Sequence, residues 1–202
     1  NLINFDFSQA KFISKMFYNC SNLEEIIFPV GDTDNIEDFS DFIAFSSKIE
    51  KVDLSTFTFT GAKNLGYMFN SGTNLKEIIF PKKKSENIEV LSEMFSLCQN
   101  LISLDLSYFS FKKIRNFAYA FNGCRNLVYI KFPTNEKAID VRNVKYMFNG
   151  CNKLTSIDLS GFSFVNIIDI SPMFSDCSAL ANLILPQNEM AINIQDFSYM
   201  FR

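Results

Sequence analysis

The apolar residues of this chain follow one pattern that returns every 26 or 27 residues. Each copy opens on a bulky apolar residue, has a small residue three positions later and Leu or Ile six positions later, and ends in two apolar residues spaced by two. The opening residues are Phe17, Ile43, Phe69, Phe95, Phe121, Phe148, Phe174 and Phe201. Self-similarity at a fixed period of this length is the sequence signature of a solenoid, in which each repeat packs against its neighbours.

Two different spacings within each copy predict two kinds of element. The first half carries apolar residues spaced by 3, 4, 7 and 10 positions, typical of a short amphipathic helix, as in Val144, Met147, Phe148, Cys151 and Leu154. In the copy around Phe174, Pro172 predicts a short helix that begins near Ser171. In the second half, Ile157 and Leu159 lie on either side of Asp158, and this alternation predicts a strand.

The copies alternate between two types. In one type the strand ends in Asp-Leu-Ser and is followed by two phenylalanines spaced by two, which are Phe57/Phe59, Phe109/Phe111 and Phe162/Phe164. In the other type the strand ends in an apolar residue and proline, as at Phe80-Pro81, and a polar loop follows. The true period is therefore about 52 residues, and we expect both rings of each spaced pair to point inward.

Phenylalanine dominates the aromatic residues, with 24 Phe and no Trp in 202 residues. Only Phe12, Phe42 and Phe45 fall outside the recurring positions. Residues at one recurring position lie one strand spacing apart, about 4.8 Å, in a stack of parallel strands. We therefore expect the rings to form a buried core of offset stacks.

All five cysteines occupy the small position of the repeat, which also holds Ser46 and Gly72. A position that accepts Ser and Gly requires small volume, and parallel neighbours about 4.8 Å apart exceed the Cβ separation of a disulfide. We expect five free, buried thiols. A zinc site would require clustered Cys pairs, which this sequence does not contain.

Two stretches carry a resemblance to a known family. Residues 120–133 (AFNGCRNLVYIKFP) resemble the BspA-type leucine-rich repeat of surface proteins, and Met147–Ser160 is similar to a 26-residue variant of it. The resemblance covers the whole chain. It implies a curved solenoid with a parallel sheet, exposed on bacterial or protist surfaces, that adheres to host proteins or other cells, and it carries no catalytic motif.

The fold class expected from the repeat and the resemblance is an α/β leucine-rich-repeat solenoid. We expect about seven stacked units of about 26 residues in two alternating types, with a parallel sheet on one face and short helices on the other. Residues 1–202 form a single domain in this interpretation. Its localisation, extracellular or at the cell surface, is implied by the resemblance alone.

The composition and charge of the chain reduce the number of function classes to consider. With 19 basic and 22 acidic residues, a net charge of −3 and no histidine, the chain gives no reason to expect nucleic-acid binding, a metal or a cofactor. No apolar run is long enough for a membrane helix, and this stretch contains no signal peptide. Asp53, Asp105 and Asp158 recur roughly 10 Å apart, too far to share a calcium ion and without the surroundings of a catalytic pair. We therefore expect no enzyme. The lysine run at 82–84 is interpreted as solvated surface, with weak binding of an anionic partner as the alternative.

The outward strand positions are the candidate binding site, because solenoids bind partners through extended sheet faces. We expect protein partners, such as host or other cell-surface proteins, or copies of the chain itself. The alternative is that scattered apolar residues on this face have no role. The candidate residues are Glu25, Ile27, Lys51, Asp53, Glu77, Ile79, Asp105, Tyr129, Lys131, Asp158 and Ile184.

Neither end of the sequence shows a polar capping repeat. Core-type residues stand at both ends, namely Leu2, Phe5, Phe7, Phe197, Met200 and Phe201. We therefore expect the repeats to continue in a longer array, or copies to stack end to end. The second possibility makes a structural subunit, which self-assembles into a filament or a cell-surface layer, the alternative function.

Overall fold

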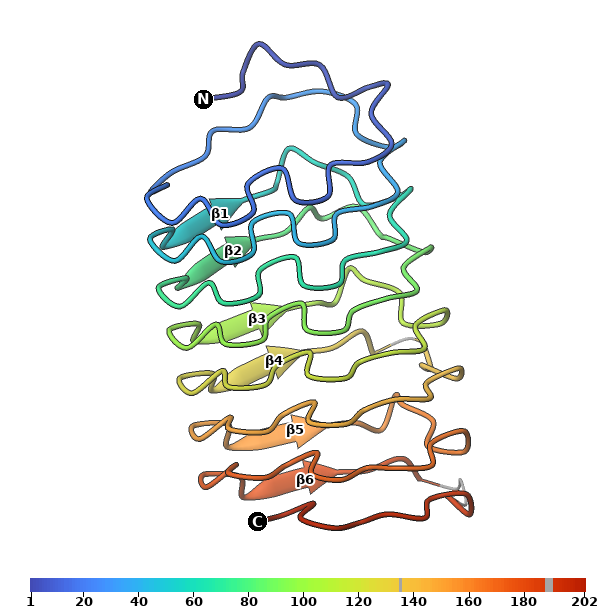
Figure 1. Ribbon diagram of the computed structural model, residues 1–202. Helices are drawn as coiled ribbons and strands as arrows, with labels where there is room; N and C mark the ends of the chain where they lie inside the picture. Colours follow the sequence, from blue (N-terminus) through green and yellow to red (C-terminus); the bar gives the residue numbers. More distant parts are fainter. Residues whose placement is uncertain (135, 188–190) are drawn as a thin grey trace.

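The computed structural model is an elongated solenoid, whose coils stack in sequence order from the N-terminus to the C-terminus (Figure 1). It describes residues 1–134, 136–187 and 191–202. Each strand lies on the same side of the stack, so that the strands form one column. The strands are β1 (Lys51–Asp53), β2 (Glu77–Ile79), β3 (Ser103–Asp105), β4 (Tyr129–Lys131), β5 (Ser156–Asp158) and β6 (Asn182–Ile184).

The strands pair two by two, in parallel. The pairs are β1 with β2, β3 with β4, and β5 with β6, each in its own two-stranded sheet. Each sheet joins an Asp-Leu-Ser unit to the proline unit that follows it. The N–H of Leu54 extends the first ladder by donating to the carbonyl of Ile79 at 2.8 Å, whereas the chain after β2 soon reaches Pro81, which has no N–H to donate. The alternation predicted from the sequence is thus also the unit of strand pairing.

The expected strand around Ile26 is absent from the described residues. In the alternation, its partner is the segment Asn1–Leu2, and the contact between them is the hydrogen bond from the N–H of Leu2 to the carbonyl of Ile27 at 2.8 Å. One such bond is too little for a ladder. Strands therefore form at six of the seven expected positions.

The short helices predicted opposite the strands are wrong, because the described residues contain no helix. The segment Val144–Leu154 instead forms successive tight turns, in which the N–H of Met147 donates to the carbonyl of Val144 and the N–H of Cys151 to that of Phe148, each at 3.1 Å. Left-handed backbone makes these turns possible. It recurs two residues before and two residues after the opening residue of the repeat, as at Tyr146 and Gly150 with φ of 56° and 72°.

Alternate amides on this turn face bond to the next coil, which explains why no helix forms. The N–H of Tyr119 donates to the carbonyl of Lys145, and the N–H of Phe121 to that of Met147, both at 2.9 Å. In a helix these amides would bond four residues back within their own coil. Left-handed φ costs a non-glycine residue about 1–2 kcal/mol, which the bonds between coils offset. Pro172 departs from the pattern, because its ring fixes a negative φ and it has no N–H. It lies in a turn and does not begin a helix.

Phenylalanine rings fill the space between the strands and the turns. One column of rings stacks with offset, nearly parallel planes, with centroids 5.3–5.8 Å apart and planes within 9° of parallel, and it is formed by Phe69, Phe95, Phe121, Phe148, Phe174 and Phe201. The rings of the spaced pairs also point inward but meet their neighbours edge to face, as at Phe80 and Phe109 (5.0 Å, 69°). The prediction of offset stacks is therefore confirmed for this column and wrong for the rings of the spaced pairs. Phe42, outside the recurring positions, is also fully buried.

We predict that Phe121→Ala lowers the free energy of unfolding by about 3–5 kcal/mol, because it leaves a ring-sized cavity. The ring is 1% exposed and lies between those of Phe95 and Phe148. Phe12→Ala is the matched control, since the Phe12 side chain is 68% exposed. Urea denaturation followed by circular dichroism measures both, and equal effects would contradict the core assignment.

Candidate functional site

The strands present the candidate residues on one open face. In β1, β3, β4 and β5, the first and third residues are exposed and the central residue is buried. Ten of the eleven candidates are exposed, and Ile79 is half-buried. Tyr129 and Ile184 are 52% and 46% exposed, so each leaves apolar surface in contact with solvent. The period-two prediction of an outward face is therefore confirmed at these positions.

Ion pairs between neighbouring strands connect part of this face. Lys51 Nζ lies 3.0 Å from a carboxylate oxygen of Glu77, and Lys131 Nζ lies 3.3 Å from one of Asp105. Both partners in each pair are about half exposed, so each pair contributes little to stability. The pairs do fix the positions of these four charged groups on the face, because each pair joins two strands that are hydrogen-bonded to each other.

The recurring aspartates have a structural role that the sequence reasoning missed. The side chains of Asp53, Asp105 and Asp158 each accept the backbone N–H of the serine two residues later, at 2.8–2.9 Å. Such Asx turns end a strand and reverse the chain. Hydrogen bonds from Ser55 lower the pKa of Asp53, so its carboxylate stays ionised. The repeated Asp-Leu-Ser string was the signal for this turn.

Two open depressions gather eight of the candidate residues. The first, of about 760 Å³, lies between residues 24–28 and β1, and its lining includes Glu25, Ile27, Lys51 and Asp53. The second, of about 640 Å³, lies between β4 and β5, and its lining includes Tyr129, Lys131, Asp158 and Ile184. Both occur where a proline unit meets the next Asp-Leu-Ser unit, which is where strands are not paired. Glu77, Ile79 and Asp105 line neither of these two depressions.

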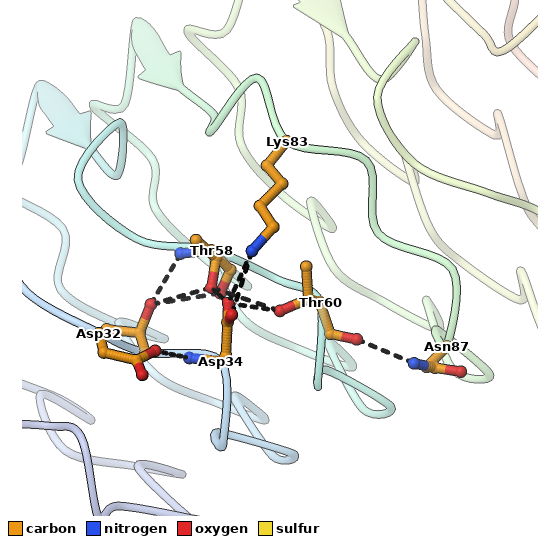
Figure 2. A network of polar contacts seen from close by, with 7 residues as sticks. Asp32, Asp34, Thr58, Thr60, Lys83 and Asn87 are labelled. Atoms are coloured by element: carbon orange, nitrogen blue, oxygen red, sulfur yellow. Dashed lines mark hydrogen bonds and ion pairs between the residues drawn. The ribbon is translucent and has the colours of Figure 1, made fainter.

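A polar network ties the loop after the first proline to the two coils that follow. Asp34 accepts hydrogen bonds from the hydroxyls of Thr58 and Thr60 and from the ammonium group of Lys83 at 3.0 Å (Figure 2). These bonds lower the pKa of Asp34 to about 2. Asn87 donates to the carbonyl of Thr60 at 2.8 Å, which links the same loops again.

The lysine run at 82–84 is exposed, as expected, but two of its members also make ion pairs that the sequence did not predict. Lys83 pairs with Asp34, and Lys84 pairs with Glu136 in the opposite direction along the solenoid. The side chain of Glu136 is only 6% exposed and also lies 3.2 Å from Lys112 Nζ. Its bonds to Lys84, Ser110 and Lys112 lower the pKa of Glu136 to about 2. The run therefore clamps loops that are far apart in the sequence.

All five thiols are free, as expected, but only three are buried. Cys98, Cys124 and Cys151 are buried, whereas Cys20 and Cys177 are half-buried. Cys124 Sγ donates to the carbonyl of Phe95 at 3.0 Å, and the Ser46 hydroxyl makes the equivalent bond at 2.7 Å. The small position thus also favours a hydrogen-bond donor. Burial raises the pKa of Cys98 to about 12, so this thiol is protonated and a poor nucleophile at neutral pH. No cluster of metal-ligating side chains occurs in the ranges that the structure describes.

Residues 89–201 match the BspA type leucine rich repeat region in six copies. The chain belongs to the BspA-type leucine-rich-repeat family. Residues 1–100 and 44–128 of this BspA-type chain also match a family described as a Mycoplasma protein of unknown function. Membership confirms the resemblance stated above, and it fits the column of short parallel strands.

A crystal structure of a leucine-rich repeat protein from Bacteroides ovatus is similar over 94% of the BspA-type chain at 16% sequence identity, with a TM-score of 0.33. The chain spans 66% of that protein's length. No curated protein matches this BspA-type chain. Within the described part of the chain, no helix has the length and apolar character needed to cross a membrane.

We predict that Cys124→Ser lowers the free energy of unfolding by less than about 1 kcal/mol, because the hydroxyl keeps the donor to Phe95. Cys124→Val is the matched comparison. It adds volume to a filled position and removes the donor, so it costs about 1–3 kcal/mol. Urea denaturation of both variants checks the prediction, and a Ser variant less stable than the Val variant would contradict the role of the hydrogen bond.

The stabilising effect of Glu136 should depend on pH. The pKa of Glu136 is about 2 in the folded chain and 4.5 ordinarily, so its ionised form stabilises the fold above about pH 4.5, and this contribution is lost as the pH falls towards 2. Glu136→Gln should therefore be less stable than the native chain at pH 6 and approach it in stability near pH 2.

Chemical denaturation at pH 6, 4 and 2.5 measures the stability difference between the two chains. Glu86→Gln is the control, because Glu86 is exposed and lies 3.5 Å from Lys84; it should change stability little at any of these pH values. A difference for Glu136→Gln that stays constant between pH 6 and 2.5 would exclude the clamp as the source of the pH dependence.

Proposed function

We propose that this chain is a non-enzymatic protein-interaction module of a cell surface, and that it binds its partner through the strand face. The observation that carries the proposal is the pair of open depressions, which collect eight outward residues of β1, β4, β5, β6 and the segment before β1. Protein interaction is the general role of leucine-rich repeats. Adhesion to host or other cell-surface proteins is the specific form proposed for this chain.

The physics of the face supports binding. The central strand residues are held in the core, as at Val52 and Ile157, which are each 3% exposed. The outward side chains therefore stand on a scaffold that changes little when a partner docks, and less conformational entropy is lost on binding. Tyr129 combines a large apolar ring with a polar hydroxyl, a residue type enriched at the energetic centres of interfaces.

The chemical groups present favour binding over turnover. The recurring aspartates are engaged in Asx turns, and the buried thiol of Cys98 is protonated at neutral pH. A location outside the cell belongs to the proposal and rests on the family. End-to-end assembly into a filament or layer, the alternative from the sequence, stays a prediction.

A displayed library of random 12-residue peptides, selected on the immobilised chain, tests the proposal. Peptides that bind the native chain should bind Tyr129→Ser/Lys131→Ser about tenfold to a hundredfold more weakly, since an interface centre is worth about 2 kcal/mol or more. The matched control is Lys145→Ser/Tyr146→Ser, which removes the same two residue types from the turn face. Peptides that bind both double variants as tightly as the native chain would show that the strand face is not the site.

A further inference from the structure

Charge is distributed unevenly along the strand face. In the three coils nearest the N-terminus almost every outward position is charged, and these residues are Glu24, Glu25, Glu50, Lys51, Asp53, Lys76 and Glu77. In the last three coils only Lys131 and Asp158 are charged at the corresponding positions. Carboxylates outnumber ammonium groups in the first set. The face therefore has an acidic end and a weakly charged end.

Lys51 and Lys76 are engaged in ion pairs, whereas Lys48, which lines the first depression, pairs with no residue that the structure describes. The lining of that depression still has more carboxylates (Glu24, Glu25, Glu50 and Asp53) than ammonium groups (Lys48 and Lys51). Lys51 lies 3.0 Å from Glu77, and Lys76 Nζ lies 2.8 Å from a carboxylate oxygen of Glu50. Glu24 and Glu25 make no ion pair with any residue that the structure describes, and both line the first depression. Their carboxylates are therefore free to accept hydrogen bonds from a partner.

The same depression has a buried polar atom beneath its surface. Thr56 lines the wall of the depression, and its hydroxyl oxygen is buried without a hydrogen-bond partner among the described residues. A buried hydroxyl without a partner costs about 1–3 kcal/mol.

The second depression offers different chemistry. Its lining combines the exposed parts of Tyr129 and Ile184, together with Phe132 and Pro133, with four charged residues of both signs, which are Lys131, Glu136, Lys137 and Asp158. The ammonium group of Lys131, which belongs to β4 and to this lining, donates a hydrogen bond to Asp105. This end of the face is therefore suited to an apolar side chain, which gains free energy by leaving water.

The two depressions are close enough for one partner. About four coils separate them, or ~19 Å at one strand spacing per coil. A partner of standard size covers about 800 Å² on each side, and an extended 12-residue peptide reaches about 40 Å. Either spans both depressions at once.

We propose that the partner presents a basic segment with an apolar anchor. Its Lys or Arg side chains lie over Glu24 and Glu25, and its anchor enters the depression between β4 and β5. This inference rests on the proposed function, because it uses the same face, and it adds the chemistry and the direction of the partner. Charge complementarity carries the inference, since the unpaired carboxylates of Glu24 and Glu25 lie at one end of the face and the apolar surfaces of Tyr129 and Ile184 lie at the other.

The peptides selected in the library experiment provide the probe. Those that lose affinity for Tyr129→Ser/Lys131→Ser are strand-face ligands, and we expect them to be enriched in Lys and Arg. Fluorescence anisotropy of each labelled peptide then compares the native chain with Glu24→Gln/Glu25→Gln at 50 mM and 500 mM NaCl. We expect binding to the variant to be about threefold to tenfold weaker at low salt, from two exposed charge pairs. High salt should remove most of this difference.

The control variant is Glu86→Gln/Glu89→Gln, which removes two exposed carboxylates away from the strands and should leave binding unchanged. Strand-face ligands that lack basic residues and bind Glu24→Gln/Glu25→Gln as tightly as the native chain would overturn the inference while the strand-face function stands. If no selected peptide depends on Tyr129 and Lys131, the proposed function fails and this inference fails with it.

Discussion

The rest of this structure depends on the backbone hydrogen bonds that pass from each coil to the next. On the turn face, one set of amides closes tight turns within its own coil, and the alternate set donates to carbonyls one coil away. This division fixes the rise from coil to coil and brings equivalent residues into register. Phenylalanine can then stack on phenylalanine, as Phe121 does on Phe148 at 5.3 Å, and a small donor side chain such as Cys124 can reach the carbonyl of the preceding coil.

Strand pairing adds a second constraint that shapes the binding face. Because the ladders join coils two by two, the face contains unpaired junctions, and the two depressions occur at such junctions. The alternation of Asp-Leu-Ser and proline units therefore determines more than the shape of the loops. Two of these junctions carry the depressions, with outward residues such as Lys51 and Tyr129 at their walls, whereas the junction between β2 and β3 carries neither of the two.

The sequence predicts which residues are buried much better than it predicts the backbone that buries them. Spacings of 3, 4, 7 and 10 at Val144–Leu154 fit a helix, but consecutive turns bury the same positions. A helix and consecutive turns differ in which carbonyls accept the alternate amides. Here the acceptors lie in another coil, and the periodicity along one coil does not reveal such a contact. Gly123 and Gly150, two residues after the opening residue of the repeat, were the local sign of left-handed backbone. The outward face followed from period-two alternation, whereas the clamp between Lys83 and Asp34 joins residues 49 positions apart and left no local signal.

The central claim is that the turn face is held by bonds between coils and contains no helix. Scalar coupling through hydrogen bonds, measured by NMR on deuterated protein, detects the bonded partner of each amide directly. The structure requires coupling between the amide nitrogen of Phe121 and the carbonyl carbon of Met147, because the N–H of Phe121 donates to the carbonyl oxygen of Met147 at 2.9 Å. Coupling from Phe121 to the carbonyl carbon of Phe117, four residues back, is the signature of a helix and would contradict the account.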